Sequence, residues 1–266
     1  MSTPGGGSTR NVPLLIAAAA VLVAAVVAIA VGVNQAGNSG TPTPPPTASE
    51  SASASATPTA TPTPSFIPYA DCSTKTFGPV LQPLNPPTNV HTYPAEPAHT
   101  IDDTKLYLVT ITTAKGNIVF CLQPELAPNT VNVFVTLARN HFFDGIPFHR
   151  VVTGFVIQGG DPNCIGNVPA PPAAPSGSCG QGGPGFSFND ETPRQAYTLG
   201  CVALANSEPK VPNSNGSQFF ICTADDTTLA QSGHFNLFGK VQTGMNVVLQ
   251  IVQGDLMQTV TAQESQ

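Results

Sequence analysis

The chain has 266 residues, a formal net charge of −6 and no tryptophan. Its 9 lysine and arginine residues do not form a cluster, which argues against nucleic acid or anionic lipid headgroups as the main partner. The hydrophobic fraction of 41% is an average over segments of very different composition, so each segment needs its own interpretation.

Residues 14–33 form an apolar run without a charged side chain. As a helix, this run would be about 30 Å long, which matches the hydrocarbon thickness of a bilayer. We predict a transmembrane signal-anchor, and Arg10 in the preceding residues 1–13 places that tail in the cytoplasm. The rest of the chain would then be extracytoplasmic, on a single-pass protein of the cell membrane. Two alternatives stay open: a cleaved signal peptide, which would leave a secreted protein, and a buried core helix.

Residues 34–65 consist almost entirely of serine, threonine, alanine, proline and glycine, with Glu50 as the single charged residue. Such a composition cannot bury a core, so we predict a disordered linker. Its repeated Thr-Pro steps favour an extended chain that would hold the following domain away from the membrane. The threonines of this linker are either unmodified or glycosylated, and composition does not distinguish these two states.

The remaining chain has the length of one domain. Residues 66–100 are rich in proline and lack periodicity, which predicts an irregular segment that wraps along the surface. Residues 101–266 are predicted to form the folded domain. Its first elements are strands at residues 106–113 and 118–122, joined by a turn at residues 114–117.

A helix is predicted from Pro128 to about Asn140, because apolar residues recur with helical spacing at Val131, Phe134 and Val135. The later elements are predicted as strands at residues 197–205, 219–223 and 235–241 and a helix at residues 245–252. Many strands with two helices predict a mainly β fold, either an antiparallel barrel or a sandwich.

Two segments combine an arginine, glutamines and aromatic residues. Residues 148–161 read FHRVVTGFVIQGGD, and residues 215–223 read NGSQFFICT. The first segment alternates apolar and polar side chains before it ends in a glycine pair and an aspartate. A sheet would therefore hold Arg150, Phe155 and Gln158 in fixed positions.

Both segments closely resemble the signature segments of the cyclophilin family, and the similarity extends from about Leu106 to Val248. The resemblance implies an eight-stranded antiparallel barrel capped by two helices. It also implies peptidyl-prolyl cis-trans isomerase activity, with neither a cofactor nor a metal ion.

Rotation about an Xaa-Pro peptide bond faces a barrier of about 18–20 kcal/mol, because resonance gives the bond partial double-bond character. A fixed guanidinium beside apolar walls can lower that barrier, since its donors favour the pyramidal nitrogen of the transition state over the planar ground state. In cyclophilins the arginine after Phe-His is catalytic, and the resemblance assigns this role to Arg150. An ordinary salt bridge is the alternative role for this residue.

The resemblance also implies a substrate-binding groove around Arg150. Gln158 and Gln218 would orient the arginine and bind the substrate backbone. Ala205 and Asn206 would run beside the bound peptide. The pocket for the proline ring would be walled by Phe155, Val156, Phe220, Leu229 and Phe235.

Some positions depart from the cyclophilin pattern or allow a plainer interpretation. Phe235 stands where the family usually carries a pocket histidine, with His234 one residue earlier. Thr228 stands where many members carry a tryptophan that contributes to cyclosporin binding, which implies weak binding of that compound. For Phe155 and Phe220, burial in a barrel core is the alternative to a place in the pocket.

Six cysteines lie after the apolar run, where an exported domain meets an oxidising environment. Cys164 and Cys179 bracket a proline- and alanine-rich insertion, and we predict a disulfide between them. A zinc site is disfavoured, because the chain has neither a Cys-x-x-Cys motif nor a histidine pair at ligand spacing. Two further pairings stay open: Cys72 with Cys121 and, on strands that the resemblance makes neighbours, Cys201 with Cys222.

The leading hypothesis is a membrane-tethered isomerase that acts on Xaa-Pro bonds of exported proteins while they fold. The alternative is a catalytically weak chaperone or scaffold module that holds proline-containing segments in the same groove. Binding alone needs Phe155 and Phe220, whereas catalysis also needs Arg150. The joint presence of Arg150, Gln158 and Gln218 favours the enzyme.

Overall fold

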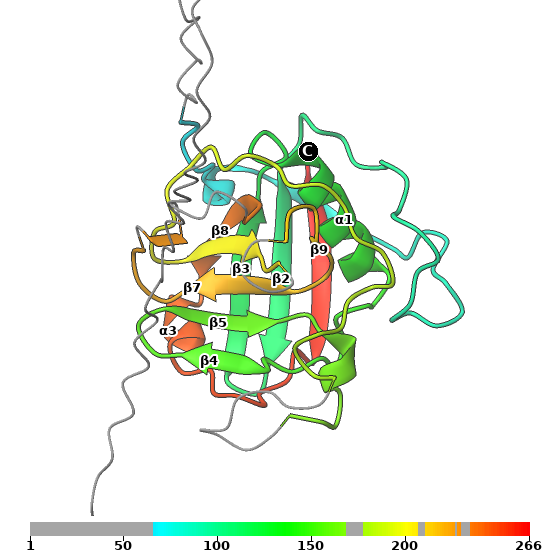
Figure 1. Ribbon diagram of the computed structural model, residues 1–266. Helices are drawn as coiled ribbons and strands as arrows, with labels where there is room; N and C mark the ends of the chain where they lie inside the picture. Colours follow the sequence, from blue (N-terminus) through cyan, green and yellow to red (C-terminus); the bar gives the residue numbers. More distant parts are fainter. Residues whose placement is uncertain (1–65, 169–177, 207–210, 227, 230–234) are drawn as a thin grey trace, which may run out of the picture. The chain divides into compact units, whose positions relative to one another are not determined.

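The computed structural model describes residues 66–168, 178–206, 211–226, 228–229 and 235–266 (Figure 1). The predicted tail, signal-anchor and linker at residues 1–65 lie outside these ranges, as does part of the insertion between Cys164 and Cys179. Within the described ranges, no helix is long and apolar enough to cross a membrane.

Nine strands of the described chain pair into one antiparallel sheet, in the order β1-β9-β2-β3-β8-β6-β7-β5-β4. The strands are β1 (Phe77–Val80), β2 (Tyr107–Thr113), β3 (Gly116–Leu122), β4 (Arg150–Val152), β5 (Val156–Gly159), β6 (Cys201–Leu204), β7 (Phe219–Cys222), β8 (Leu237–Thr243) and β9 (Thr259–Ser265). In Figure 1, β4, β5 and β7 run across the direction of β2, β3 and β9. Side chains from both halves of the sheet belong to one large buried apolar cluster.

The predicted mainly β, antiparallel fold is confirmed, but the predicted closed barrel of eight strands is not. In the described part of the chain, the strand order ends at β1 and β4, which are not paired with each other. The additional strand β1 comes from residues 66–100, for which the sequence predicts no regular structure. Pro79 lies inside β1 and has no N–H to donate, which confines such a strand to the edge of a sheet.

The predicted first helix forms as α1 (Pro128–Arg139) and begins at Pro128, whose missing N–H is not needed in the first turn. The residue before it provides no side-chain cap. Instead, the Glu191 carboxylate accepts hydrogen bonds from the backbone N–H of Asn129 at 3.0 Å and of Thr130 at 2.9 Å. A negative charge stabilises this end of a helix, so Glu191 fastens its distant loop to α1.

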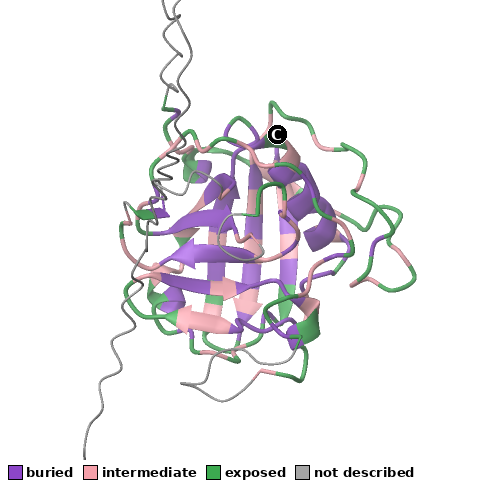
Figure 2. Cartoon of the chain, viewed as in Figure 1, coloured by how far each residue is buried: buried purple, intermediate pink, exposed green. Residues whose placement is uncertain are grey.

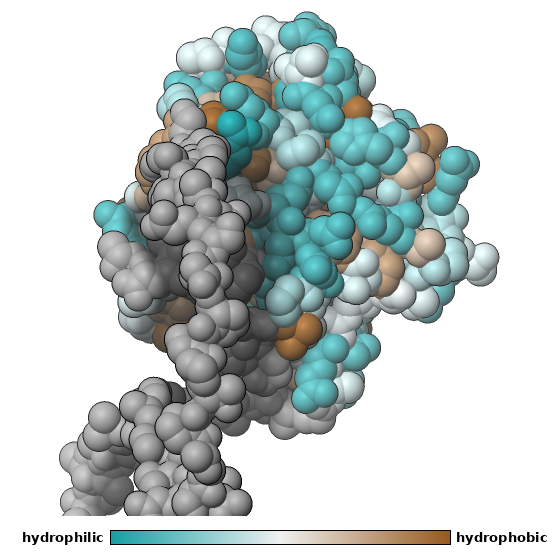
Figure 3. Space-filling view, turned by 45° about the horizontal axis from the view of Figure 1, so that its top comes forward, coloured by the Kyte–Doolittle hydropathy of each residue, from teal (hydrophilic) through white to brown (hydrophobic). Residues whose placement is uncertain are grey.

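The core is built around Phe134 of α1. Its ring centroid lies 4.7 Å from that of Phe143 and 5.8 Å from that of Phe120 in β3. The centroids of Phe219 in β7 and Phe238 in β8 each lie 5.3 Å away. Figure 2 shows buried residues along α1 and the strands, whereas the coloured surface in Figure 3 is mostly hydrophilic, with small separate hydrophobic patches. Apolar burial is therefore concentrated between α1 and the sheet.

Other elements match the predictions to different degrees. The hairpin predicted around residues 114–117 forms from β2 and β3. The first signature segment is not one strand, because Gly154 adopts a φ of 72° and the chain folds back from β4 into β5. The second helix is limited to α3 (Met245–Val248), and β9 has no counterpart among the predicted elements.

All six cysteines form disulfides. The bonds are Cys164–Cys179, Cys201–Cys222 and Cys72–Cys121. The first is the predicted bond, and the other two are the pairings that the sequence left open. The second bond joins the neighbouring strands β6 and β7. The first and third involve the short 3-10 helices η2 (Pro162–Cys164) and η1 (Cys72–Thr74).

Candidate functional site

A pocket of about 450 Å³ lies over the neighbouring strands β4, β5, β7 and β6. It is lined by Arg150, Phe155, Val156, Gln158, Ala205, Asn206, Phe220, Leu229 and Phe235. All of these residues belong to the site predicted from the sequence. The remaining predicted residue, Gln218, lines an adjoining hollow of about 540 Å³ that shares Ala205 with the pocket.

Strand pairing explains why side chains from distant parts of the chain converge here. Arg150 in β4 pairs with Gln158 in β5, and Gln158 pairs with Phe220 in β7. Directly paired residues point to the same face of an antiparallel sheet. The three side chains therefore form a row across three strands. On the other side of β7, the N–H of Ala205 donates to the carbonyl of Gln218 at 2.9 Å, which holds the end of β6 beside this row.

The floor of the pocket is apolar. Val156 is 2% exposed, Phe220 4% and Leu229 6%. The rings of Phe220 and Phe235 meet edge to face, with their centroids 5.5 Å apart. Together with Phe155, these residues form a cluster separate from the main core, so Phe155 and Phe220 belong to the pocket and not to the centre of the fold.

Arg150 is half-buried at this pocket and is held by neutral partners. Its Nη1 donates to Oε1 of Gln158 at 3.3 Å, and its guanidinium carbon lies 5.7 Å from the ring centroid of Phe155. Among the described residues, none of the three ion pairs involves Arg150, so the salt-bridge alternative is not supported. Burial lowers the pKa of the guanidinium, but an arginine of this kind stays charged. The site therefore presents a positive charge beside an apolar surface.

Gln158 and Gln218 form a series of side-chain hydrogen bonds that ends at Arg150. Nε2 of Gln158 donates to Oε1 of Gln218 at 3.0 Å. Nε2 of Gln218 in turn donates to the carbonyls of Gly182 at 2.8 Å and Gly180 at 3.1 Å. Because each amide has a donor and an acceptor engaged, its orientation is fixed. Gln158 thus contacts the guanidinium directly, and Gln218 holds Gln158.

Two departures from the family pattern can be located. Phe235 lines the pocket, whereas His234 lies outside the described residues. Thr228 is exposed, and its hydroxyl donates to Oδ1 of Asp226 at 2.5 Å. Thr228 is not part of the pocket lining.

His149 precedes the arginine but does not line the pocket. It is 1% exposed, and burial lowers the pKa of its imidazole below the usual 6.5. Nearby Asp161 raises this pKa and Arg150 lowers it, both more weakly than burial does. Burial therefore favours the neutral imidazole, and the position of His149 outside the pocket lining agrees with a structural part.

Acidification should destabilise the protein through His149. Since its folded-state pKa lies below the unfolded value of 6.5, the unfolded chain binds the extra proton first. The stabilising effect of the neutral imidazole is complete above pH 6.5 and is lost as the pH falls below it, with a slope of at most about 1.4 kcal/mol per pH unit. Urea unfolding of wild type and His149→Gln between pH 7 and 5 measures this slope. Equal slopes in the two proteins would contradict the assignment.

The sequence did not predict the polar cluster behind Gln218. Asp161 is fully buried, and Oδ2 of its carboxylate accepts from the N–H of Gly180 at 2.6 Å and of Gly182 at 2.9 Å. The available signal was the aspartate that ends the first signature segment. Its partners were not predictable, because they lie beyond the insertion.

Comparison with known proteins gives matches over the part of the chain that carries this site. A family model described as cyclophilin type peptidyl-prolyl cis-trans isomerase/CLD matches residues 108–265. A putative peptidyl-prolyl cis-trans isomerase of Staphylococcus haemolyticus (strain JCSC1435) is 44% identical over 114 residues, which are 42% of this chain and 50% of that protein. A protein of the same description from Staphylococcus aureus (strain USA300) is 45% identical over 114 residues, which are 42% of this chain and 51% of that protein. The chain thus spans about half the length of these curated relatives.

The fold also has a counterpart among solved structures. A crystal structure of a cyclophilin type peptidyl-prolyl cis-trans isomerase from Cryptosporidium parvum matches with a TM-score of 0.50 and 27% sequence identity. The match covers 59% of this chain and 97% of that chain. The similarity therefore extends over almost the whole of that protein.

Proposed function

Because the chain belongs to the cyclophilin family of peptidyl-prolyl cis-trans isomerases, we propose that it accelerates rotation about Xaa-Pro bonds of polypeptides. The observation that carries this proposal is the guanidinium of Arg150, which Gln158 holds beside an apolar pocket. Rotation makes and breaks no covalent bond, so the reaction requires no cofactor.

The apolar floor would bind the proline ring. Phe220 and Leu229 are almost fully buried beneath the pocket, so a bound ring would contact apolar atoms and displace water from them. With the ring held, the carbonyl on the other side of the Xaa-Pro bond turns relative to it. Removal of water from the pocket strengthens the electrostatic effect of Arg150 on the rotating bond.

Arg150 would supply the stabilisation that the transition state needs. A guanidinium has five N–H donors, and within the described chain the guanidinium of Arg150 makes one hydrogen bond, to the side chain of Gln158. Further donors are thus available to the substrate. In the twisted transition state the proline nitrogen regains its lone pair, which accepts a hydrogen bond better than the planar ground state does. Donors fixed before the substrate binds stabilise that state without reorganisation.

The position of the protein in the cell is the second part of the proposal. We propose that residues 14–33 anchor the chain in the cell membrane, that residues 34–65 form a linker, and that the isomerase domain acts outside the cytoplasm on exported polypeptides. The three disulfides support this, since such bonds persist in oxidising compartments. Cleavage after residues 14–33 would instead give a secreted enzyme with the same site.

Magnetisation exchange on a short peptide with one Xaa-Pro bond tests the activity. Uncatalysed exchange takes about tens to hundreds of seconds, so cis-trans exchange peaks within a mixing time of about one second report catalysis. We expect these peaks with the full chain and not with the heat-unfolded protein. Peptide binding without exchange peaks would refute the enzyme and favour a module that only holds proline-containing segments.

A further inference from the structure

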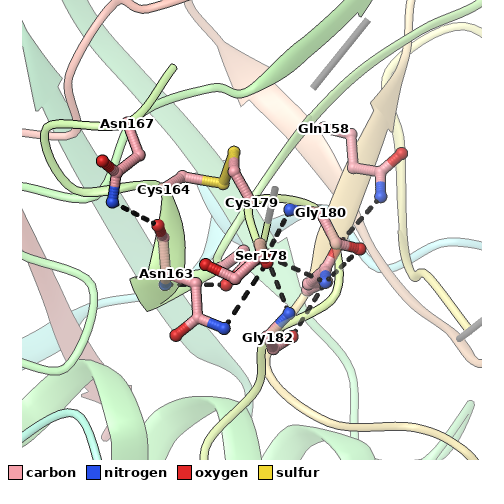
Figure 4. Close-up of a disulfide and its surroundings, with 10 residues drawn as sticks. Gln158, Asn163, Cys164, Asn167, Ser178, Cys179, Gly180 and Gly182 are labelled. Atoms are coloured by element: carbon pink, nitrogen blue, oxygen red, sulfur yellow. Dashed lines mark hydrogen bonds between the residues drawn. A yellow bond between two sulfur atoms is a disulfide. The ribbon is translucent and has the colours of Figure 1, made fainter. Parts of the chain in front are cut away.

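Residues 178–182, which support Gln218, have two strong attachments to the fold, besides a hydrogen bond at 3.5 Å from Nδ2 of Asn163 to the carbonyl of Ser178. Figure 4 shows the first, the disulfide between Cys164 and Cys179, directly before Gly180. The second is the buried carboxylate of Asp161, which accepts from the N–H groups of Gly180 and Gly182. Both points hold the same short stretch of backbone.

Asp161 is buried without a cationic partner among the described ion pairs. Its charge is compensated by N–H donors: Oδ1 accepts from the N–H of Asn163 at 2.8 Å, and Oδ2 accepts from two glycine N–H groups and, at 3.5 Å, from Nε2 of Gln218. Burying a carboxylate is costly unless such donors surround it. The position of residues 180–182 is therefore set by the charge that they solvate.

The close approach to Asp161 depends on the absence of a side chain at position 182. A Cβ on Gly182 would collide with Oδ1 of Asp161 and with the side-chain amide of Asn163. Glycine lets the backbone come near enough to donate to the carboxylate and, through its carbonyl, to accept from Gln218. The contact between residue 182 and Asp161 therefore requires glycine at this position.

A continuous series of hydrogen bonds joins this segment to the pocket. The carbonyls of Gly180 and Gly182 hold Nε2 of Gln218. Oε1 of Gln218 holds Gln158, and Oε1 of Gln158 holds Arg150. A displacement of residues 180–182 would remove the fixed partner of Gln218 and loosen the amide that orients the arginine.

We propose that Asp161 and the Cys164–Cys179 disulfide form one positioning device for the isomerase site, with Asp161 as a positioning residue that acts through Gln218 and Gln158 on Arg150. The inference rests on the proposed isomerase function. It assigns to the buried carboxylate and to the disulfide an effect on turnover, beyond their effect on stability.

The test compares Asp161→Ala and the double variant Cys164→Ala/Cys179→Ala with wild type as full chains, at a temperature where each is folded. A misplaced catalytic group can cost up to about a hundredfold in rate, and we expect each variant to lose about tenfold in kcat. KM should change little, because the apolar floor of the pocket is intact. Asp161→Asn keeps one oxygen for the glycine N–H groups and should recover part of the loss.

The matched control removes another disulfide. Cys72→Ala/Cys121→Ala opens the disulfide between η1 and β3. In the described chain, neither cysteine is hydrogen-bonded to Gln218, Gln158 or Arg150. This variant should unfold at lower urea concentration but retain wild-type kcat. Hydrogen exchange of the Gly180 and Gly182 amides should accelerate in Cys164→Ala/Cys179→Ala and not in the control.

The outcomes separate the two proposals. An inactive wild type refutes the isomerase function itself. An active wild type, with unchanged kcat in folded Asp161→Ala and Cys164→Ala/Cys179→Ala, overturns the positioning device alone. Equal loss of kcat in the control double variant also overturns it, because disulfides in general would then be responsible.

Discussion

Replacing Arg150 by alanine is expected to lower kcat/KM for a proline-containing peptide by about 10²–10³-fold, the usual effect of removing one preorganised donor of charge stabilisation. The pocket floor around Phe220 remains, so peptide binding should persist. The loss should appear mainly in kcat, because the interaction with Arg150 strengthens in the transition state. Magnetisation exchange and a coupled peptide assay both measure it.

Two variants make the result specific to this guanidinium. Arg150→Lys keeps the positive charge but not the planar set of donors, so its activity should fall between those of wild type and Arg150→Ala. Arg139→Ala removes a guanidinium at the end of α1, where it donates to the carbonyl of Gln82, and should leave kcat/KM unchanged. Wild-type activity in Arg150→Ala would show that the pocket works without its arginine.

Phe134→Ala should cause the largest loss of stability. The side chain is 1% exposed and contacts rings from β3, β7 and β8, so its removal leaves a cavity between α1 and the sheet. Such a change costs about 3–5 kcal/mol, a large part of the roughly 5–15 kcal/mol that stabilises a typical domain. Urea unfolding with the disulfides intact measures the free energy of unfolding.

Leu249→Ala is the matched control for the core variant. Leu249 is 60% exposed, so its truncation should change the free energy of unfolding by less than about 0.5 kcal/mol. A loss below about 1 kcal/mol for Phe134→Ala would mean that the ring cluster is not the centre of the fold.

Local sequence patterns predicted the elements that are formed by residues close together in the chain. The hairpin of β2 and β3 has strand-forming residues on both sides of a turn, and α1 has Pro128 at its start and apolar residues at helical spacing. The pocket residues were assigned by the family resemblance, and for those in the two signature segments the spacing determines which side chains share a face of the sheet. The family resemblance also made neighbours of the strands that carry Cys201 and Cys222, which local spacing cannot do, and these strands pair as β6 and β7.

Elements whose position depends on distant partners were not predictable. In β9 only Val260 and Ala262 are apolar residues of the main core, and their alternation is weak among polar neighbours. In β1 the Gly-Pro step resembles a turn more than a strand. The cap that Glu191 provides for α1 and the contacts of Asp161 depend on loops brought together only by folding, so no local pattern encodes them.

The place of β9 in the sheet bears on how the protein is made. Of the nine strands β9 is synthesised last, yet it lies between β1 and β2, the first two strands to leave the ribosome. Until β9 emerges, β1 has no partner and one side of β2 has no ladder. The sheet therefore cannot be completed during translation of the earlier strands, and an unpaired strand edge that persists in this way favours aggregation and binding by chaperones.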